Sequence, residues 1–185
     1  MIKDWKKKIR DYGFLPDAEH QSVLVRRVDF LEQTIFQVKL RLMPGKMNVR
    51  LGIGYTDKFR TDQFQELLVH ANLRRGESPK HDAPGEYWEH GEGDAAWISL
   101  VEYGLPWLEL WSQPTVLLDY FEDHLKGKNA PGDHRVLGLL YYELGENEKA
   151  CKHAREWLAS VATGQGWAKE RARTRRQIKT MHCAE

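Results

Sequence analysis

The chain has 185 residues, of which 41% are hydrophobic and 11% aromatic, which is enough to form a hydrophobic core in one domain. Its 28 basic and 27 acidic residues nearly cancel to a net charge of +1, so local charge is more informative than the total. No apolar run approaches the roughly 20 residues that span a bilayer, and the opening MIKDWKKKIRDYGF lacks the apolar core of a secretion signal, so we expect a cytoplasmic protein that does not cross a membrane.

The chain contains two cysteines, Cys151 and Cys183. One lies on a predicted helix and the other lies in the last three residues, a spacing that indicates neither a disulfide framework nor a metal-binding pair. We therefore expect two reduced thiols.

The first predicted element is a short amphipathic helix. Trp5, Ile9 and Tyr12 recur at helical spacing, whereas the lysines at residues 6 to 8 face elsewhere. Gly13 follows as the expected end of this helix.

Three strands are predicted next, at residues 22 to 30, 34 to 42 and 47 to 55, and Pro44 with Gly45 suits a tight turn between the last two. Alternating apolar residues place one face of this hairpin against a core: Phe36, Val38, Leu40, Leu42, Met47, Val49, Leu51, Ile53 and Tyr55. The opposite face is expected to be polar and basic, with Gln37, Lys39, Arg41, Asn48 and Arg50.

A helix, a long loop and a fourth strand are predicted between residues 61 and 101. Thr61 can cap a helix whose apolar stripe covers the sheet, formed by Phe64, Leu67, Leu68 and Ala71. Residues 77 to 94 are too rich in Gly, Pro and charge for a regular element. The apolar run AAWISLV at residues 95 to 101 is assigned to a fourth strand.

The C-terminal half is predicted to be helical. Pro114 suits the first position of a helix, and residues 136 to 161 predict two helices folded against each other across a tight turn. This hairpin has the spacing of one tetratricopeptide unit at Leu137, Gly138, Tyr141, Gly145 and Ala150. Because a solenoid needs about three stacked repeats, we expect this single hairpin to pack on the rest of the domain.

Together these elements predict an α+β fold, with an antiparallel sheet of three or four strands covered by helices and a helical C-terminal half. We expect one domain over residues 1 to 163, with its sheet in about residues 1 to 103 and its helices in about residues 105 to 163. Residues 164 to 185 form a separate basic segment.

The loop at residues 77 to 94 is the main candidate binding site, because it has six acidic residues and one lysine around two aromatic residues. Exposed aromatic residues beside charges anchor many protein interfaces. We predict that it binds a basic protein partner through Asp82, Glu86, Tyr87, Trp88, Glu89, Glu92 and Asp94. The alternative is a solvated loop with Trp88 tucked into the core.

Catalytic and metal chemistry have weak support in this sequence. His81 and His90 share the loop with carboxylates, but their spacing matches no compact metal motif, so we predict no metal and no cofactor. Cys151 and His153 are two positions apart on a predicted helix and do not face each other. We find no catalytic residues and expect a protein that is not an enzyme.

Nucleic-acid binding is the second function class that we consider. Basic residues lie on the predicted polar sheet face and in the C-terminal segment, and could grip phosphates: Lys39, Arg41, Arg50, Arg173, Arg175 and Arg176. No aromatic residues are interleaved in the C-terminal segment to stack on bases. A solvated terminal helix is the alternative.

Five phrases along residues 5 to 160 carry a resemblance to a known family: DYGF, FQVKLRL, VRLGIGY, YGLPWLEL and LGLLYYELGENEKA. Their order resembles an uncharacterised bacterial family, described only as a domain of unknown function. Members of such families commonly sit beside polymorphic or contact-dependent toxins. The resemblance therefore implies an immunity protein that binds one cognate toxin, such as a nuclease, and neutralises it.

Overall fold

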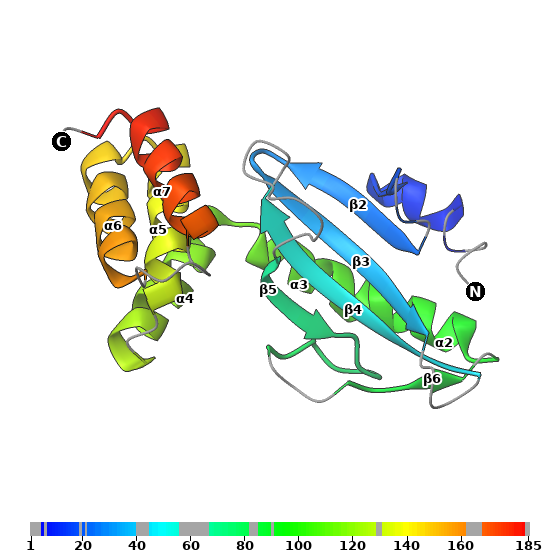
Figure 1. Ribbon diagram of the computed structural model, residues 1–185. Coiled ribbons are helices and arrows are strands. Elements are labelled where there is room, and N and C mark those ends of the chain that lie inside the picture. Colours follow the sequence, from blue (N-terminus) through cyan, green and yellow to red (C-terminus); the bar gives the residue numbers. More distant parts are fainter. Residues whose placement is uncertain are drawn as a thin grey trace. The chain divides into compact units, whose positions relative to one another are not determined.

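The computed structural model describes residues 5, 7–18, 20, 22–39, 45–55, 67–81, 85–89, 91–128, 131–161 and 168–183. The chain divides into two compact units, Met1–Gln113 and Pro114–Glu185. The first unit holds an antiparallel sheet with helices, and the second is helical, so the predicted α+β class is confirmed (Figure 1). In the described part of the chain, no helix combines the length and apolar character needed to cross a membrane.

The first unit opens with a single helical turn, η1 (Ile9–Tyr12). Trp5 and Ile9 are buried, as their spacing predicted. Gly13 ends the turn in a left-handed conformation with φ 80°, which glycine adopts without steric cost, and its N–H donates to the carbonyls of the turn.

Six strands form the sheet in the described residues: β1 (Leu15–Pro16), β2 (Val23–Val28), β3 (Leu31–Lys39), β4 (Lys46–Tyr55), β5 (Leu67–Asn72) and β6 (Trp88–Glu89). The first five lie in chain order and pair antiparallel, and β6 pairs with the start of β4 (Figure 1). The predicted three-strand meander corresponds to β2, β3 and β4.

The register of β3 and β4 differs from the predicted one. Phe36 pairs with Arg50 and Val38 pairs with Asn48, so the apolar positions of β3 share a face with polar positions of β4. Because paired residues lie on one face and faces alternate along a strand, a shift of one residue exchanges the two faces. Lys39 pairs with Met47 and therefore occupies the face opposite to Arg50. The predicted basic face was wrong.

Two further sequence-based assignments in this unit were wrong. Residues 67 to 71 were expected on a helix, but they lie in β5, where buried Val69 and Ala71 alternate with half-buried neighbours. The strand expected at residues 95 to 101 is helical instead and lies in α2 (Gly93–Ser99) and the π-helical turn η3 (Leu100–Gly104). Both segments are short enough for their apolar residues to fit either period.

Helices α2, η3 and α3 (Leu105–Trp111) follow one another and cover one face of the sheet (Figure 1). Gly104 allows this close approach, since a Cβ there would lie 3.2 Å from Leu51 and 3.1 Å from Leu73. Buried Gln33 of β3 fixes the layer by donating to the Ser112 hydroxyl at 2.6 Å and to the Leu108 carbonyl at 3.2 Å.

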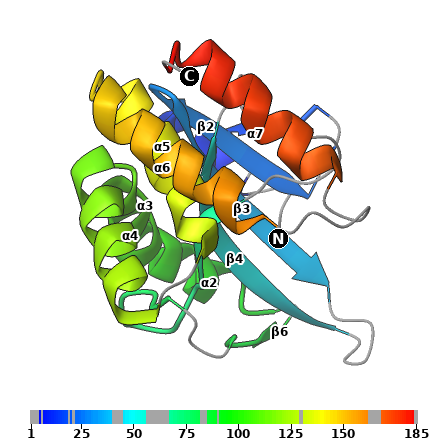
Figure 2. The same ribbon diagram turned by 60° about the vertical axis from the view of Figure 1, so that its left-hand side comes forward.

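The second unit contains α4 (Pro114–Lys128), α5 (Pro131–Glu143), α6 (Asn147–Ser160) and α7 (Ala168–Thr180). Pro114 begins α4, and α5 and α6 form the predicted hairpin (Figure 2). Gly145 makes the turn at φ 78°, and a Cβ on Gly138 would lie 3.4 Å from the α6 backbone at Ala150 and Ala154. The small residue therefore allows the two helices to approach closely.

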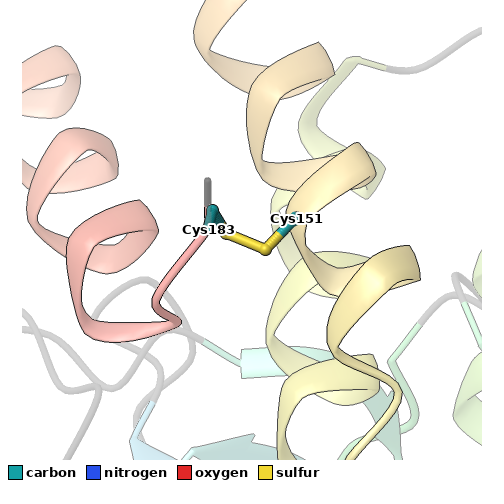
Figure 3. The surroundings of a disulfide bond; sticks show 2 residues. All are labelled: Cys151 and Cys183. Carbon is teal, nitrogen blue, oxygen red and sulfur yellow. A yellow bond between two sulfur atoms is a disulfide. The ribbon is translucent and has the colours of Figure 1, made fainter. Parts of the chain in front are cut away.

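The basic C-terminal segment is part of this second unit. Thr174 of α7 and Met181, just beyond this helix, are buried, and Arg171 donates to the carbonyls of Leu158 and Val161 at the end of α6. A disulfide joins Cys151 of α6 to Cys183 just beyond α7, with Cα atoms 5.4 Å apart (Figure 3). The expectation of two reduced thiols was wrong, because α7 folds back and closes a separation of 32 residues.

Candidate functional site

The predicted binding loop is anchored to the edge of the sheet. Strand β6 pairs Trp88 with Met47 and Glu89 with Lys46, and the Asn48 amide donates to the Glu86 carbonyl at 3.0 Å. The segment around residue 88 is therefore a short strand inside the predicted irregular region. Asp82 and His90, which were also predicted to lie in this loop, are outside the described residues.

Trp88 is fully buried, with 0% of its surface exposed. It lies opposite buried Met47 in the sheet, and the Arg75 guanidinium stacks over its ring at 4.4 Å from the centroid. The prediction that Trp88 anchors a partner was wrong, because a side chain enclosed in the core has no surface to offer. The burial of Trp88 that the alternative expected is confirmed, whereas its solvated loop is not, because residues 88 and 89 form β6.

Arg75 holds the loop through several contacts at once. Its guanidinium makes a bidentate pair with Glu92, at 2.8 Å from Nη1 to Oε1 and 2.7 Å from Nη2 to Oε2. Its backbone N–H donates to Glu86 Oε2 at 2.6 Å, and Nη2 donates to the Tyr87 carbonyl at 3.0 Å. We call Arg75, Glu86, Trp88 and Glu92 the Arg75 cluster.

The pairing of Arg75 with Glu92 shifts the pKa of both groups. The hydrogen bond from Arg75 and, second to it, the hydrogen bond that the Glu89 backbone N–H donates at 2.7 Å together lower the pKa of Glu92 to about 2. The same pair raises the pKa of Arg75. Glu92 therefore stays ionised through the acidic range in which an ordinary glutamate becomes protonated.

The Glu92 carboxyl is expected to titrate near pH 2 when followed by NMR. Since its folded pKa lies below the unfolded value near 4.5, the pair stabilises the fold fully above about pH 4.5 and loses this effect as the pH falls toward 2. In Arg75→Gln the midpoint should rise toward 4.5, whereas Arg74→Gln, which removes the neighbouring ion pair with Glu77, should leave it in place. A wild-type midpoint near 4.5 would contradict the pairing.

Three of the predicted residues lie at the surface of this loop. Tyr87 is 42% exposed, the Glu89 side chain is 69% exposed, and Asp94 is exposed in the first turn of α2. The described part of residues 85 to 94 carries four carboxylates. Glu86 and Glu92 pair with Arg75, and the Glu89 carboxylate lies 4.0 Å from the Lys46 ammonium. The surface is acidic, but less so than the sequence suggested, because the protein's own cations neutralise part of it.

Of the two loop histidines, His81 lies in the described residues. The His81 backbone bridges to Ala71, and its ring lies 5.8 Å from the ring of His70, measured between centroids. His90 lies outside the described residues. Among the side chains that the structure places, no three or more His, Cys, Asp or Glu gather as a metal site.

The residues predicted to bind nucleic acid fall into different parts of the molecule. Arg50 is exposed on β4, whereas Lys39 occupies the opposite sheet face by register and Arg41 lies outside the described residues. Arg173, Arg175 and Arg176 belong to α7 in the second unit, where Arg175 and Arg176 are exposed.

Arg75 is the functional residue that the sequence reasoning missed. Arg75 stands between Arg74 and Gly76 after an apolar segment, and this pattern indicated only the end of a helix. The available signal was charge balance, since a loop with six acidic residues needs cations close by and the pair at residues 74 and 75 is the nearest in the sequence.

Comparisons of the chain with protein-family models, curated proteins and solved structures found no match. The resemblance to a toxin-associated family therefore stays a prediction.

Proposed function

We propose that this protein is a non-enzymatic protein-binding module, an immunity protein that binds a cognate bacterial toxin and neutralises it. The observation that supports the proposal best is that the Tyr87 side chain is exposed while Arg75 donates a hydrogen bond to the Tyr87 backbone carbonyl. The family resemblance supplies the class of partner.

The contact surface consists of Tyr87, Glu89 and Asp94, and the Arg75 cluster supports it. A tyrosine presents a large contact area and a hydroxyl at low conformational cost. Because the Arg75 contacts already order the backbone at Tyr87, binding requires little further loss of entropy. A rigid, exposed aromatic residue with a polar rim is the arrangement typical of an interface hot spot.

The charge of this surface favours a basic partner. Glu89 stands at the rim, and the four carboxylates of residues 85 to 94 outnumber the two cations that pair with them. A basic cleft, such as that of a nuclease toxin, would be attracted to this surface, and occupying it would exclude nucleic acid.

Affinity capture tests the proposal: tagged wild-type and variant chains are used to capture partner proteins from the native host, and the captured proteins are compared. The tagged wild-type chain should retain a protein that Tyr87→Ala/Glu89→Lys loses. The matched control Leu144→Ala/Asp123→Lys changes an apolar residue that is also 42% exposed and a carboxylate that is 80% exposed, both in the second unit. Equal capture by both double variants would reject this surface.

The compartment is part of the same proposal. The sequence predicts a cytoplasmic protein, whereas a disulfide such as Cys151–Cys183 persists mainly in oxidising compartments. The number of free thiols in the protein from its native host, measured after thiols are blocked before lysis, distinguishes the cytoplasm from an oxidising compartment. Two blocked thiols indicate the cytoplasm, and none indicates an oxidising compartment.

A second candidate function is nucleic-acid binding through α7. Arg175, Arg176 and Lys179 are exposed on this helix, whereas Thr174 is buried, so the cationic residues lie away from the packed side. RNA affinity at low salt should fall steeply as salt rises, and it should weaken in Arg175→Glu/Arg176→Glu. Undetectable RNA binding at low salt would remove this candidate.

A further inference from the structure

Helices α2, η3 and α3 form one continuous helical rod along the sheet (Figure 1). The side of this rod that faces away from the sheet carries exposed residues at helical spacing: Asp94, Ile98, Glu102, Pro106, Glu109 and Leu110. Ile98 is 53% exposed and Leu110 is 48% exposed, so two large apolar side chains of this face are in contact with solvent. We call these six residues the α2–α3 ridge.

The π-helical turn η3 aligns the apolar residues of the ridge. The Leu105 N–H donates to the Leu100 carbonyl, five residues earlier, so this turn holds one residue more than an α-helical turn. In an uninterrupted α-helix, Ile98 and Leu110 would point about 120° apart. The extra residue brings them close to one line along the rod, and the exposure of both side chains agrees with this. Such turns often occur at functional sites.

The ridge carries charge of one sign. Residues 91 to 111 contain no lysine, arginine or histidine, and the charged residues of the ridge are all acidic. Asp94 and Glu102 each lie four residues from Ile98, so they are its neighbours on the same helical face. An exposed apolar side chain therefore stands between two carboxylates.

Two cations lie beside the ridge, and both contact other residues of the first unit. Arg26 of β2 pairs with Glu109 and also donates to Gln33 at 2.8 Å. The Lys8 ammonium lies 5.6 Å from the centroid of the Trp97 ring. Because Arg26 neutralises Glu109, the negative charge of the ridge comes from its other two carboxylates.

The proposed partner surface needs more area than Tyr87, Glu89 and Asp94 provide. A stable protein complex buries about 800 Å² on each partner and involves about 20 to 30 residues a side. Asp94 belongs to both the Tyr87 surface and the α2–α3 ridge, so the two are continuous. From Asp94 to Leu110 the rod extends roughly 20 to 25 Å, a large part of the width of such an interface.

We propose that the α2–α3 ridge is the second part of the partner interface and enters an apolar groove, edged by lysines or arginines, on the basic protein partner. This inference rests on the proposed function and extends it from one exposed tyrosine to a helix-in-groove contact. Ile98 and Leu110 fill the groove, and Asp94 and Glu102 face its basic edges. Because the rod is already packed on the sheet, binding orders only side chains.

Affinity for the partner that the wild-type chain captures tests the ridge. Ile98→Ala/Leu110→Ala should bind this partner at least about tenfold more weakly than wild type. The control Leu144→Ala, which shortens a side chain that is 42% exposed in the second unit, should bind as wild type does. At low salt, Glu102→Lys should associate more slowly than Asp123→Lys, a change at a side chain that is 80% exposed in the second unit.

A photo-crosslinking residue in place of Ile98 gives a measurement that does not depend on a loss of affinity. It should cross-link the captured partner, whereas the same residue in place of Leu144 should not. Equal affinity in wild type and the folded Ile98→Ala/Leu110→Ala variant, or no cross-link from position 98, would overturn the ridge.

Failure of the ridge and failure of the proposed function give different results. If Tyr87→Ala/Glu89→Lys loses the partner while the ridge variants keep it, the ridge alone is rejected. If the wild-type chain captures no protein that depends on the Tyr87 surface, the proposed function is rejected, and the ridge is rejected with it.

Discussion

Trp88→Ala is expected to lower the free energy of unfolding of the first unit by about 3 to 5 kcal/mol, the usual range for removing a buried tryptophan. The side chain is fully enclosed and carries the Arg75 guanidinium on its face, so truncation leaves a cavity and removes the surface on which Arg75 stacks. Urea denaturation followed by circular dichroism measures the change.

Tyr87→Ala is the matched control for this prediction. Its side chain is 42% exposed, and Arg75 contacts only its backbone carbonyl, so truncation should cost less than about 1 kcal/mol. Similar small losses in both variants would mean that Trp88 is not part of the core, and the reassignment of Trp88 from interface to core would then fail.

Removing the disulfide is expected to destabilise the second unit by about 3 to 4 kcal/mol, the loss of chain entropy predicted for closing a loop of this length. The bond closes a separation of 32 residues and joins the segment just beyond α7 to α6, and among the described α7 side chains Ala168 and Ala172 are exposed and Ile178 is half-buried. The double variant Cys151→Ser/Cys183→Ser should therefore lose the helical signal of α7 at lower urea than wild type.

A reductant gives the complementary measurement. Dithiothreitol should lower the stability of the wild type to the level of the double serine variant and should leave that variant unchanged. If the oxidised and reduced wild-type proteins unfolded at the same urea concentration, the bond would not be what holds α7 in place.

The parts of the fold that local residues specify could be predicted from the sequence. The α5–α6 hairpin depends on Gly138, which permits close helix contact, and on Gly145, which makes the turn at φ 78°. Gly13 ends η1 for the same local reason, and Pro114 begins α4. Each of these features depends on the residue type at a single position, so it can be predicted from the sequence without knowledge of distant contacts.

The strand register could not be read in the same way. The alternation in β3 and in β4 is clear within each strand, but their pairing depends on which residues meet across the hairpin. Asn48 and Gly52 are buried as well as Val49 and Leu51, so both faces of β4 contain buried residues and Arg50 is exposed between them. The polar positions of β4 therefore do not mark one solvent-facing side. The predicted basic face failed for this reason.

The site itself depends on contacts between distant segments. Arg75 and Glu92 are 17 positions apart, and the two cysteines are 32 positions apart. The loop composition predicted an acidic surface with an exposed aromatic residue, and Tyr87 fits that description. Which of Tyr87 and Trp88 is exposed depends on the pairing of β6 with β4. A strand of two residues has too little sequence pattern for this pairing to be predicted.

The rate of association between this protein and its captured partner, measured at low and at high salt, tests most directly the claim that the Tyr87 surface binds a basic protein. Wild type and Asp123→Lys should associate at the same rate and slow equally as salt rises, whereas Glu89→Lys should associate several-fold more slowly at low salt and respond less to salt. Identical rates for Glu89→Lys and Asp123→Lys at both salt concentrations would contradict that claim.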